Sequence, residues 1–173
     1  MTDIVQEAEP PGTVHKIPLL VKAGLADERM VDLESGRSVT TILEIFAVER
    51  GCAVEELVIV REGEHAPLTE VVLVEVDYPR RRRHHVHHKS AVKVTVYYQA
   101  SSYEREFKRY EAVEDVLTWA IKVFNIDRGM ATEFELALHG QTTELPGSEH
   151  IGHVAGRACD LVLDLIRGHI SNG

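Results

Sequence analysis

The feature that most constrains the fold of this 173-residue chain is an internal repeat of one amphipathic helix pattern. Apolar residues recur at i, i+3, i+4 and i+7 in two places, which is typical of helices that bury one face. The second copy begins 74 positions after the first. The two faces are formed by Val39, Ile42, Leu43, Phe46 and Ala47, and by Val113, Val116, Leu117, Ala120, Ile121 and Phe124.

Strand-like runs surround each predicted helix in the same order. Two runs precede each helix: residues 17–21 and 29–33 in the first copy, and residues 92–98 and 103–110 in the second. The runs that follow are 57–60 and 71–76 in the first copy, and 134–138, 142–145 and 160–165 in the second. A helix crossing one face of a mixed sheet is the economical packing for this order. The repeat therefore predicts an α+β protein with two tandem β-grasp domains.

A basic, histidine-rich segment separates two acidic halves. The net charge is −10 over residues 1–79, +5 over 80–89 and −4 over 90–173. Residues 79–90 contain one apolar side chain, so we expect an exposed linker there. The predicted organisation is a flexible N-terminus at 1–14, a first domain at 15–78, a linker at 79–90, a second domain at 91–166 and an exposed tail at 167–173. The acidic domains repel phosphate, so specific nucleic-acid binding is not expected.

Two groups of histidines are candidate metal ligands. Histidines in a flexible linker lack preset geometry and supporting hydrogen bonds, so no metal site is predicted. A pair without an HExxH motif on a helix does not indicate a hydrolase. With no nucleotide-binding motif either, we expect neither an enzyme nor a bound cofactor. The groups are His84, His85, His87 and His88 in the predicted linker, and His150 and His153 in a glycine-rich segment.

The expected location is the cytoplasm. Cys52 and Cys159 form no CxxC pair or disulfide framework, which suits a reducing compartment. The acidic N-terminus lacks the apolar core of a secretory signal. No apolar run approaches the roughly 20 residues of a membrane span, so no membrane partner is expected.

Several motifs of the second half resemble ubiquitin. EAVEDVLTWAI, residues 111–121, resembles the start of the ubiquitin helix. LALHGQTTELPG, residues 136–147, resembles its strand–turn–strand, and LVLDLIRG, residues 161–168, its final strand. The first half matches more weakly. Tandem ubiquitin-like domains followed by a C-terminal glycine are similar to the interferon-induced two-domain modifier of vertebrates. They are also similar to the modifiers of bacterial Bil-type antiphage operons.

The resemblance implies a protein tag that is conjugated through Gly173. An E1-like enzyme would use ATP to activate the carboxylate of Gly173 and pass it as a thioester to an E2-like enzyme. The final acceptor would be an amine of a target protein, and a deconjugating protease would reverse the attachment. Ubiquitin-like tails usually end in two glycines, so the single glycine implies a dedicated activating enzyme. The tail residues expected in the enzyme channel are His169, Ile170, Ser171 and Asn172.

The last predicted strand also presents a candidate partner surface. Alternation places Leu161, Leu163 and Leu165 in the core and the intervening residues on the outer face. This is the face where ubiquitin carries its apolar recognition patch. For this surface, the alternative is a plain solvated sheet face. For the function of the chain, the alternatives to a conjugated tag are a non-covalent tandem binding module and a sulfur carrier. The predicted partner-binding residues are Ala137, His139, Val162 and Asp164.

Overall fold

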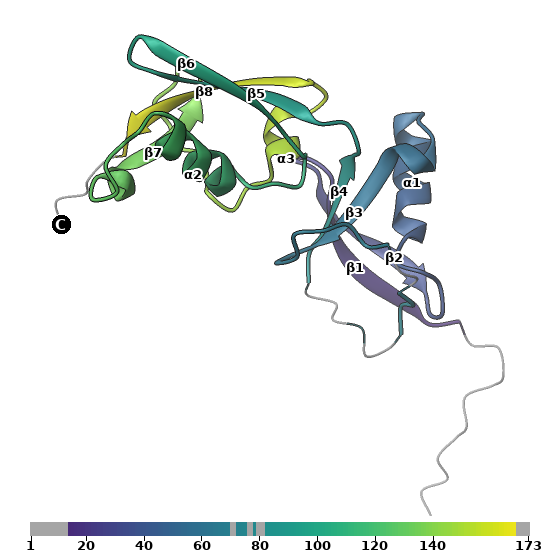
Figure 1. The fold of residues 1–173 in the computed structure, drawn as a ribbon. Coiled ribbons are helices and arrows are strands. Elements are labelled where there is room, and N and C mark those ends of the chain that lie inside the picture. The colour runs from purple at the N-terminus through teal and green to yellow at the C-terminus, as the bar shows by residue number, and fades with distance from the viewer. Residues whose placement is uncertain (1–13, 70–71, 76–77, 79–81, 169–173) are drawn as a thin grey trace, which may run out of the picture.

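The computed structural model describes residues 14–69, 72–75, 78 and 82–168 (Figure 1). The first domain contains strands β1 (Lys16–Lys22), β2 (Glu28–Glu34), β3 (Leu57–Arg61) and β4 (His84–His88), with helices α1 (Thr41–Arg50) and η1 (Val54–Glu56). The second contains β5 (Val92–Tyr98), β6 (Ser101–Phe107), β7 (Phe134–Leu138) and β8 (Asp160–Arg167), with α2 (Val113–Val123), η2 (Ala131–Glu133) and α3 (Ile151–Ala155).

The two sheets have the same topology. Their strand orders are β2-β1-β4-β3 and β6-β5-β8-β7. In each, the two central strands are parallel and the outer strands pair antiparallel to them. The predicted α+β class, with two tandem ubiquitin-like β-grasp domains, is confirmed.

The repeated apolar helix faces form the two cores. In α1 the buried residues include Ile42 and Phe46, and in α2 they include Val116 and Ala120. Each helix face packs with the alternating apolar residues of its own sheet into one cluster. The helix periodicity therefore predicts correctly which side of each helix is buried.

The prediction of an exposed linker at 79–90 is wrong for the part that becomes β4. β4 lies between β1 and β3, paired parallel to β1 and antiparallel to β3. It takes the place in the first sheet that β8 takes in the second. The polar composition of the strand conceals this position, because His84 and Val86 face the core while His85 and His87 face the second domain.

The prediction that residues 71–76 form the last strand of the first domain is also wrong. The structure describes residues 72–75 of this run, and they form no strand. Leu73 makes one isolated bridge, to Ser38. Val39 N donates to Val72 O and Val74 N donates to Arg37 O, so this segment pairs with the loop that enters α1. In the second domain, Ala112 and His150 make the corresponding bridge.

The domain boundaries shift accordingly. β4 ends at His88 and β5 begins at Val92, so residues 89–91 alone connect the two sheets. β8 extends to Arg167, one residue into the predicted tail at 167–173. Residues 1–13 of the predicted flexible N-terminus lie outside the described residues. None of the described helices is long and apolar enough to cross a membrane.

Candidate functional site

The base of the predicted conjugation tail is anchored at the end of β8. Gly168 N donates to Glu133 O at 2.7 Å. A Cβ on Gly168 would lie 3.1 Å from side-chain atoms of Glu135 and Glu144, so glycine suits this narrow passage. The predicted conjugation residue and channel residues lie outside the described residues: Gly173, His169, Ile170, Ser171 and Asn172.

The outer sheet face of the second domain contains the predicted partner residues, and part of it is accessible. Val162 is 38% exposed, and Tyr97 from β5 contacts the exposed ring of His139. His139 Nδ1 lies 2.7 Å from Asp164 Oδ1. Burial raises the pKa of Asp164, but the hydrogen bonds from His139 and Gly140 outweigh it and hold that pKa below its usual value.

Ala137 does not contribute to this surface as predicted. It pairs with Asp164 across β7 and β8 but is fully buried. It also forms a bridge with Glu144, which follows β7 in the chain. Alternation assigns Ala137 to the outer side of the sheet, but an alanine is too short to reach past the chain around it.

The corresponding face of the first domain meets the second domain. His85 on β4 pairs with Val60, as Asp164 on β8 pairs with Ala137. Val60 and His85 are both buried. Helix α3 packs against β4, as the ribbon also shows (Figure 1). The part of this face around Val60 and His85 is therefore covered, whereas Met30 on β2 is 53% exposed.

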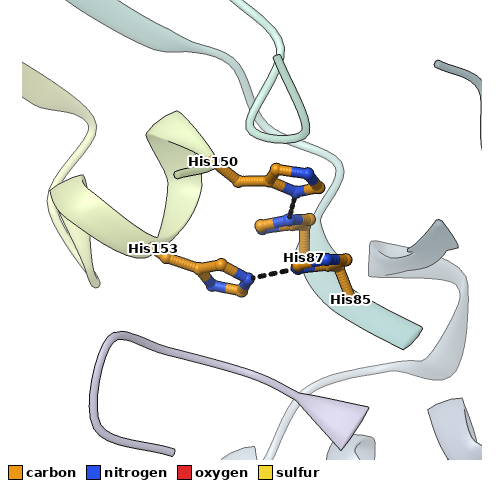
Figure 2. Close-up of side chains that lie close together, drawn as sticks. All are labelled: His85, His87, His150 and His153. Carbon is orange, nitrogen blue, oxygen red and sulfur yellow. Dashed lines mark hydrogen bonds between the residues drawn. The ribbon is translucent and has the colours of Figure 1, made fainter. Parts of the chain in front are cut away.

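Four imidazoles from the two domains converge at this contact (Figure 2). His85 and His87 come from β4, His150 caps the start of α3, and His153 lies within α3. His85 Nδ1 is 3.0 Å from His153 Nε2, and His87 Nε2 is 2.8 Å from His150 Nδ1. One nitrogen from each ring lies within 4.8 Å of the other three. We call these four residues the histidine cluster.

Burial keeps the rings of the histidine cluster neutral. It lowers the pKa of His150 to about 4 and that of His153 to about 2. It also lowers the pKa of His85, where the hydrogen bond with Glu62 opposes the effect, and it holds that of His87 well below its usual value. A neutral imidazole has one nitrogen that donates and one with a free lone pair.

Polar contacts outside the histidine cluster also hold the domains together. Lys22 at the end of β1 forms an ion pair of 3.0 Å with Glu149, and both side chains are largely buried. The buried Arg109 donates through Nε to Ser90 in the short connection. Its other nitrogens donate to Gly156 O at 2.9 Å and Ala158 O at 2.8 Å. The connection is thereby bound to the loop between α3 and β8.

A groove of about 620 Å³ lies between the domains beside the histidine cluster. Its walls include His87 and His153, so two of the four rings border open space. Both cysteines, Cys52 and Cys159, also border it. The groove therefore borders the side of the histidine cluster that His87 and His153 form.

Gly152 allows α3 to approach β4 and Arg109 closely. A Cβ there would lie 2.6 Å from both Arg109 Cβ and His87 Nδ1, and 2.9 Å from Arg109 O. We expect Gly152→Ala to destabilise the protein by about 1–3 kcal/mol, because a packed backbone must shift. Urea unfolding measures this difference.

Gly147→Ala is the matched control for that substitution. Its new Cβ would make ordinary contact with Glu114 at 3.6 Å. We expect Gly152→Ala to lower the free energy of unfolding clearly more than Gly147→Ala does. Equal losses of stability would contradict the close approach of α3 to β4 and Arg109.

The sequence contained one signal of the missed site. The segment between α1 and β4 has 33 residues, and the segment between α2 and β8 has 36. If the number of residues between the helix and the last strand is similar in both domains, the strand that corresponds to β8 falls at the histidine run and not at residues 71–76. Strand alternation then places His85 and His87 together on the outer face. The approach of His150 and His153 depends on domain docking, which no local pattern reveals.

The topology and the accessible outer face define a tandem ubiquitin-like protein. Residues 93–168 match the family model described as BilA ubiquitin-like domain 2. The second domain is therefore similar to the BilA ubiquitin-like domain, and the first domain repeats its strand topology.

Solved structures similar to the chain include ubiquitin-like proteins. Caldiarchaeum subterraneum ubiquitin is 18% identical, with a TM-score of 0.38, over 47% of this chain and 99% of its own. A protein of Arabidopsis thaliana is 18% identical, with a TM-score of 0.37, over 48% and 93%. The N-terminal ubiquitin-like domain of the 4931431F19Rik protein is 12% identical, with a TM-score of 0.37, over 49% and 82%. No curated protein matched the sequence.

Proposed function

We propose that this chain is a protein modifier that is joined through the carboxylate of Gly173 to amines of target proteins. The observation that carries the proposal is the match of residues 93–168 to a BilA ubiquitin-like domain. The proposed setting is a cytoplasmic antiphage pathway of bacteria. The chain is the substrate of that pathway, with no catalytic residue or cofactor of its own.

The proposed chemistry takes place at the carbonyl carbon of Gly173. A carboxylate oxygen attacks the α-phosphorus of ATP on an E1-like enzyme, giving an acyl adenylate and pyrophosphate. A cysteine thiolate of that enzyme then displaces AMP to form a thioester. The acyl group passes to a cysteine of an E2-like enzyme, and a target amine finally displaces the thiol to form an amide. A deconjugating protease hydrolyses the amide and regenerates the carboxylate.

The fold supports this chemistry by positioning the tail. β8 is held between β5 and β7, and Gly168 N is bound to Glu133 O where the strand ends. This fixes where the tail leaves the second domain. His169, Ile170, Ser171 and Asn172 then occupy the enzyme channel, and Gly173 lets the enzyme approach its carbonyl because glycine has no Cβ.

The accessible outer face of the second domain is the proposed recognition surface for the conjugation enzymes. Val162 and Tyr97 supply apolar area, while His139 and Asp164 supply a hydrogen-bonded polar edge. In the first domain, the residues at the corresponding strand positions, Val60 and His85, are buried. We therefore assign recognition by this type of surface to the second domain.

Deletion of Gly173 should abolish conjugation. The chain is incubated with ATP and its cognate E1-like and E2-like enzymes, and products are separated on a non-reducing gel. The unaltered chain should form thiol-sensitive adducts with both enzymes, and the shortened chain none. Gly24→Ala is a control glycine substitution, because its Cβ would meet only Asp27 Cβ, at 3.7 Å.

Two outcomes would reject the conjugation proposal. One is the absence of any adduct from the unaltered chain under conditions in which the enzymes are active. The other is an adduct that persists after Gly173 is deleted. A non-covalent binding module predicts unchanged partner binding after the deletion and no adduct at any stage.

A further inference from the structure

The histidine cluster has no role in the proposed conjugation chemistry. It lies where β4 of the first domain meets α3 of the second, whereas the end of β8, at Arg167, lies away from α3 (Figure 1). His85, His87 and His153 are each 3% exposed. A group of four imidazoles, three of them buried, requires a separate explanation, because buried polar side chains are costly unless their hydrogen-bonding capacity is used.

The arrangement of the nitrogens suits a tetrahedral ion. Zn²⁺ in protein sites is usually four-coordinate, with Zn–N distances near ~2.0–2.1 Å, so its ligand nitrogens stand about 3.3 Å apart. The two hydrogen-bonded nitrogen pairs, at 3.0 and 2.8 Å, are already this close. The widest separation, within 4.8 Å, can contract through small side-chain rotations.

A carboxylate orients one of the rings as metal-binding histidines require. Glu62 Oε2 lies 2.6 Å from His85 Nε2 and accepts a hydrogen bond from its N–H. The lone pair of neutral His85 is then on Nδ1, which faces His153. Metal-ligating histidines usually donate their other ring N–H to a carboxylate or a carbonyl in this way.

The charges around the histidine cluster are compatible with a divalent cation. Glu62 contributes a negative charge next to His85. The cations near the rings already have partners: Lys22 pairs with Glu149 at 3.0 Å, Arg83 pairs with Glu62 at 3.5 Å, and Arg109 donates to backbone carbonyl groups. The rings themselves are neutral, and the neutral imidazole is the form that ligates metals.

We propose that His85, His87, His150 and His153 form an interdomain Zn²⁺ site that locks the two ubiquitin-like domains in one relative orientation. Each domain supplies two ligands, so neither forms the site alone. His85 binds through Nδ1, His153 and His87 through Nε2, and His150 through Nδ1. The groove bordered by His87 and His153 is the entry path.

Binding of Zn²⁺ to the metal-free full-length chain tests the proposal. After treatment with a chelator and its removal, we expect one Zn²⁺ per chain by elemental analysis and calorimetry. The melting temperature should also rise with Zn²⁺ concentration, because the folded state, in which the four ligands are assembled, binds the ion more tightly than the unfolded chain does. Co²⁺ should give the visible absorption of tetrahedral coordination without a thiolate charge-transfer band, because all four ligands are nitrogens.

Substitutions separate this site from nonspecific binding by the histidine run. His153→Gln and His150→Gln should each weaken Zn²⁺ binding by more than about 100-fold, and Glu62→Gln by about 10- to 100-fold. His88→Gln is the matched control on the same strand, because His88 bonds to Ser90 instead. His139→Gln is the exposed control in the second domain.

Folding of each variant is checked by circular dichroism, and the half-buried His150 provides the substitution least expected to disturb the core. The proposal is rejected if the unaltered chain binds no Zn²⁺. It is also rejected if binding survives both His150→Gln and His153→Gln, or is lost on replacing Cys52 or Cys159 with serine. None of these results depends on conjugation through Gly173.

Discussion

Leu163→Ala is expected to destabilise the second domain by about 2–5 kcal/mol. Leu163 lies in the middle of β8, is fully buried, and belongs to the core cluster of that domain. Removal of its isobutyl group loses apolar burial and leaves a cavity that the sheet cannot readily close, because β8 is held between two strands.

The measurement uses the natural probe of that domain. Trp119 is the single tryptophan of the chain, and its ring packs edge-to-face on Phe107 at 5.5 Å. Its fluorescence during urea unfolding therefore reports on the second domain. The control is Val162→Ala, one position away on the same strand but 38% exposed, which should cost less than about 1 kcal/mol. Equal losses would show that burial of β8 does not follow the described alternation.

Arg109→Met is expected to destabilise the protein by about 3 kcal/mol and to loosen the connection between the domains. Methionine keeps the apolar stem but removes every hydrogen bond of the guanidinium. Four acceptors then lose this donor: the carbonyl groups of Ser90, Gly156 and Ala158, and the hydroxyl of Ser90. Arg109→Lys should recover only part of the loss, because an ammonium cannot reproduce the planar fork.

Hydrogen exchange and urea unfolding together test the role of Arg109. Exchange should accelerate in the loop between α3 and β8 and in residues 89–91. Arg128→Met removes an exposed arginine of the same domain and should leave both measurements nearly unchanged. Unaltered exchange in Arg109→Met would mean that the hydrogen bonds to Gly156 and Ala158 do not hold the loop.

The parts of the fold that local periodicity determines could be predicted. The spacing of Ile42 and Phe46, and of Val116 and Ala120, gave the buried helix faces. The alternation of Leu161 and Leu163 with Val162 gave the two faces of β8. These patterns are set by geometry within one element, so they are visible in a single sequence.

β4 could not be predicted by the same reasoning, because both of its faces are buried in different surroundings. His84 bonds to Tyr78 within the first domain, while His85 and His87 meet histidines more than sixty positions later in the chain. A strand that buries polar groups against another domain resembles an exposed loop in composition. Val74 shows the opposite case: its apolar run was predicted as a strand, but Val74 is fully buried without belonging to a sheet strand.

In the candidate site too, local patterns predicted some features, and others depended on tertiary contacts. Val162 and Asp164 were placed on the outer face by alternation, while the burial of Ala137 depends on the chain around it. The histidine cluster unites two groups that sequence reasoning treated separately. Its existence depends on how two finished domains dock, which is a tertiary property.

The connection of only three residues between β4 and β5 affects how tightly a partner protein can bind both domains at once. Two domains joined by a long flexible linker lose orientational freedom when one partner binds both, and this loss of entropy weakens binding. Here the short connection, the Arg109 contacts and the Lys22–Glu149 pair limit that freedom before the partner binds. Contacts to the second module then add to affinity at a high effective concentration. A receptor shaped to this pair would discriminate it from single ubiquitin-like domains by geometry as well as by surface chemistry.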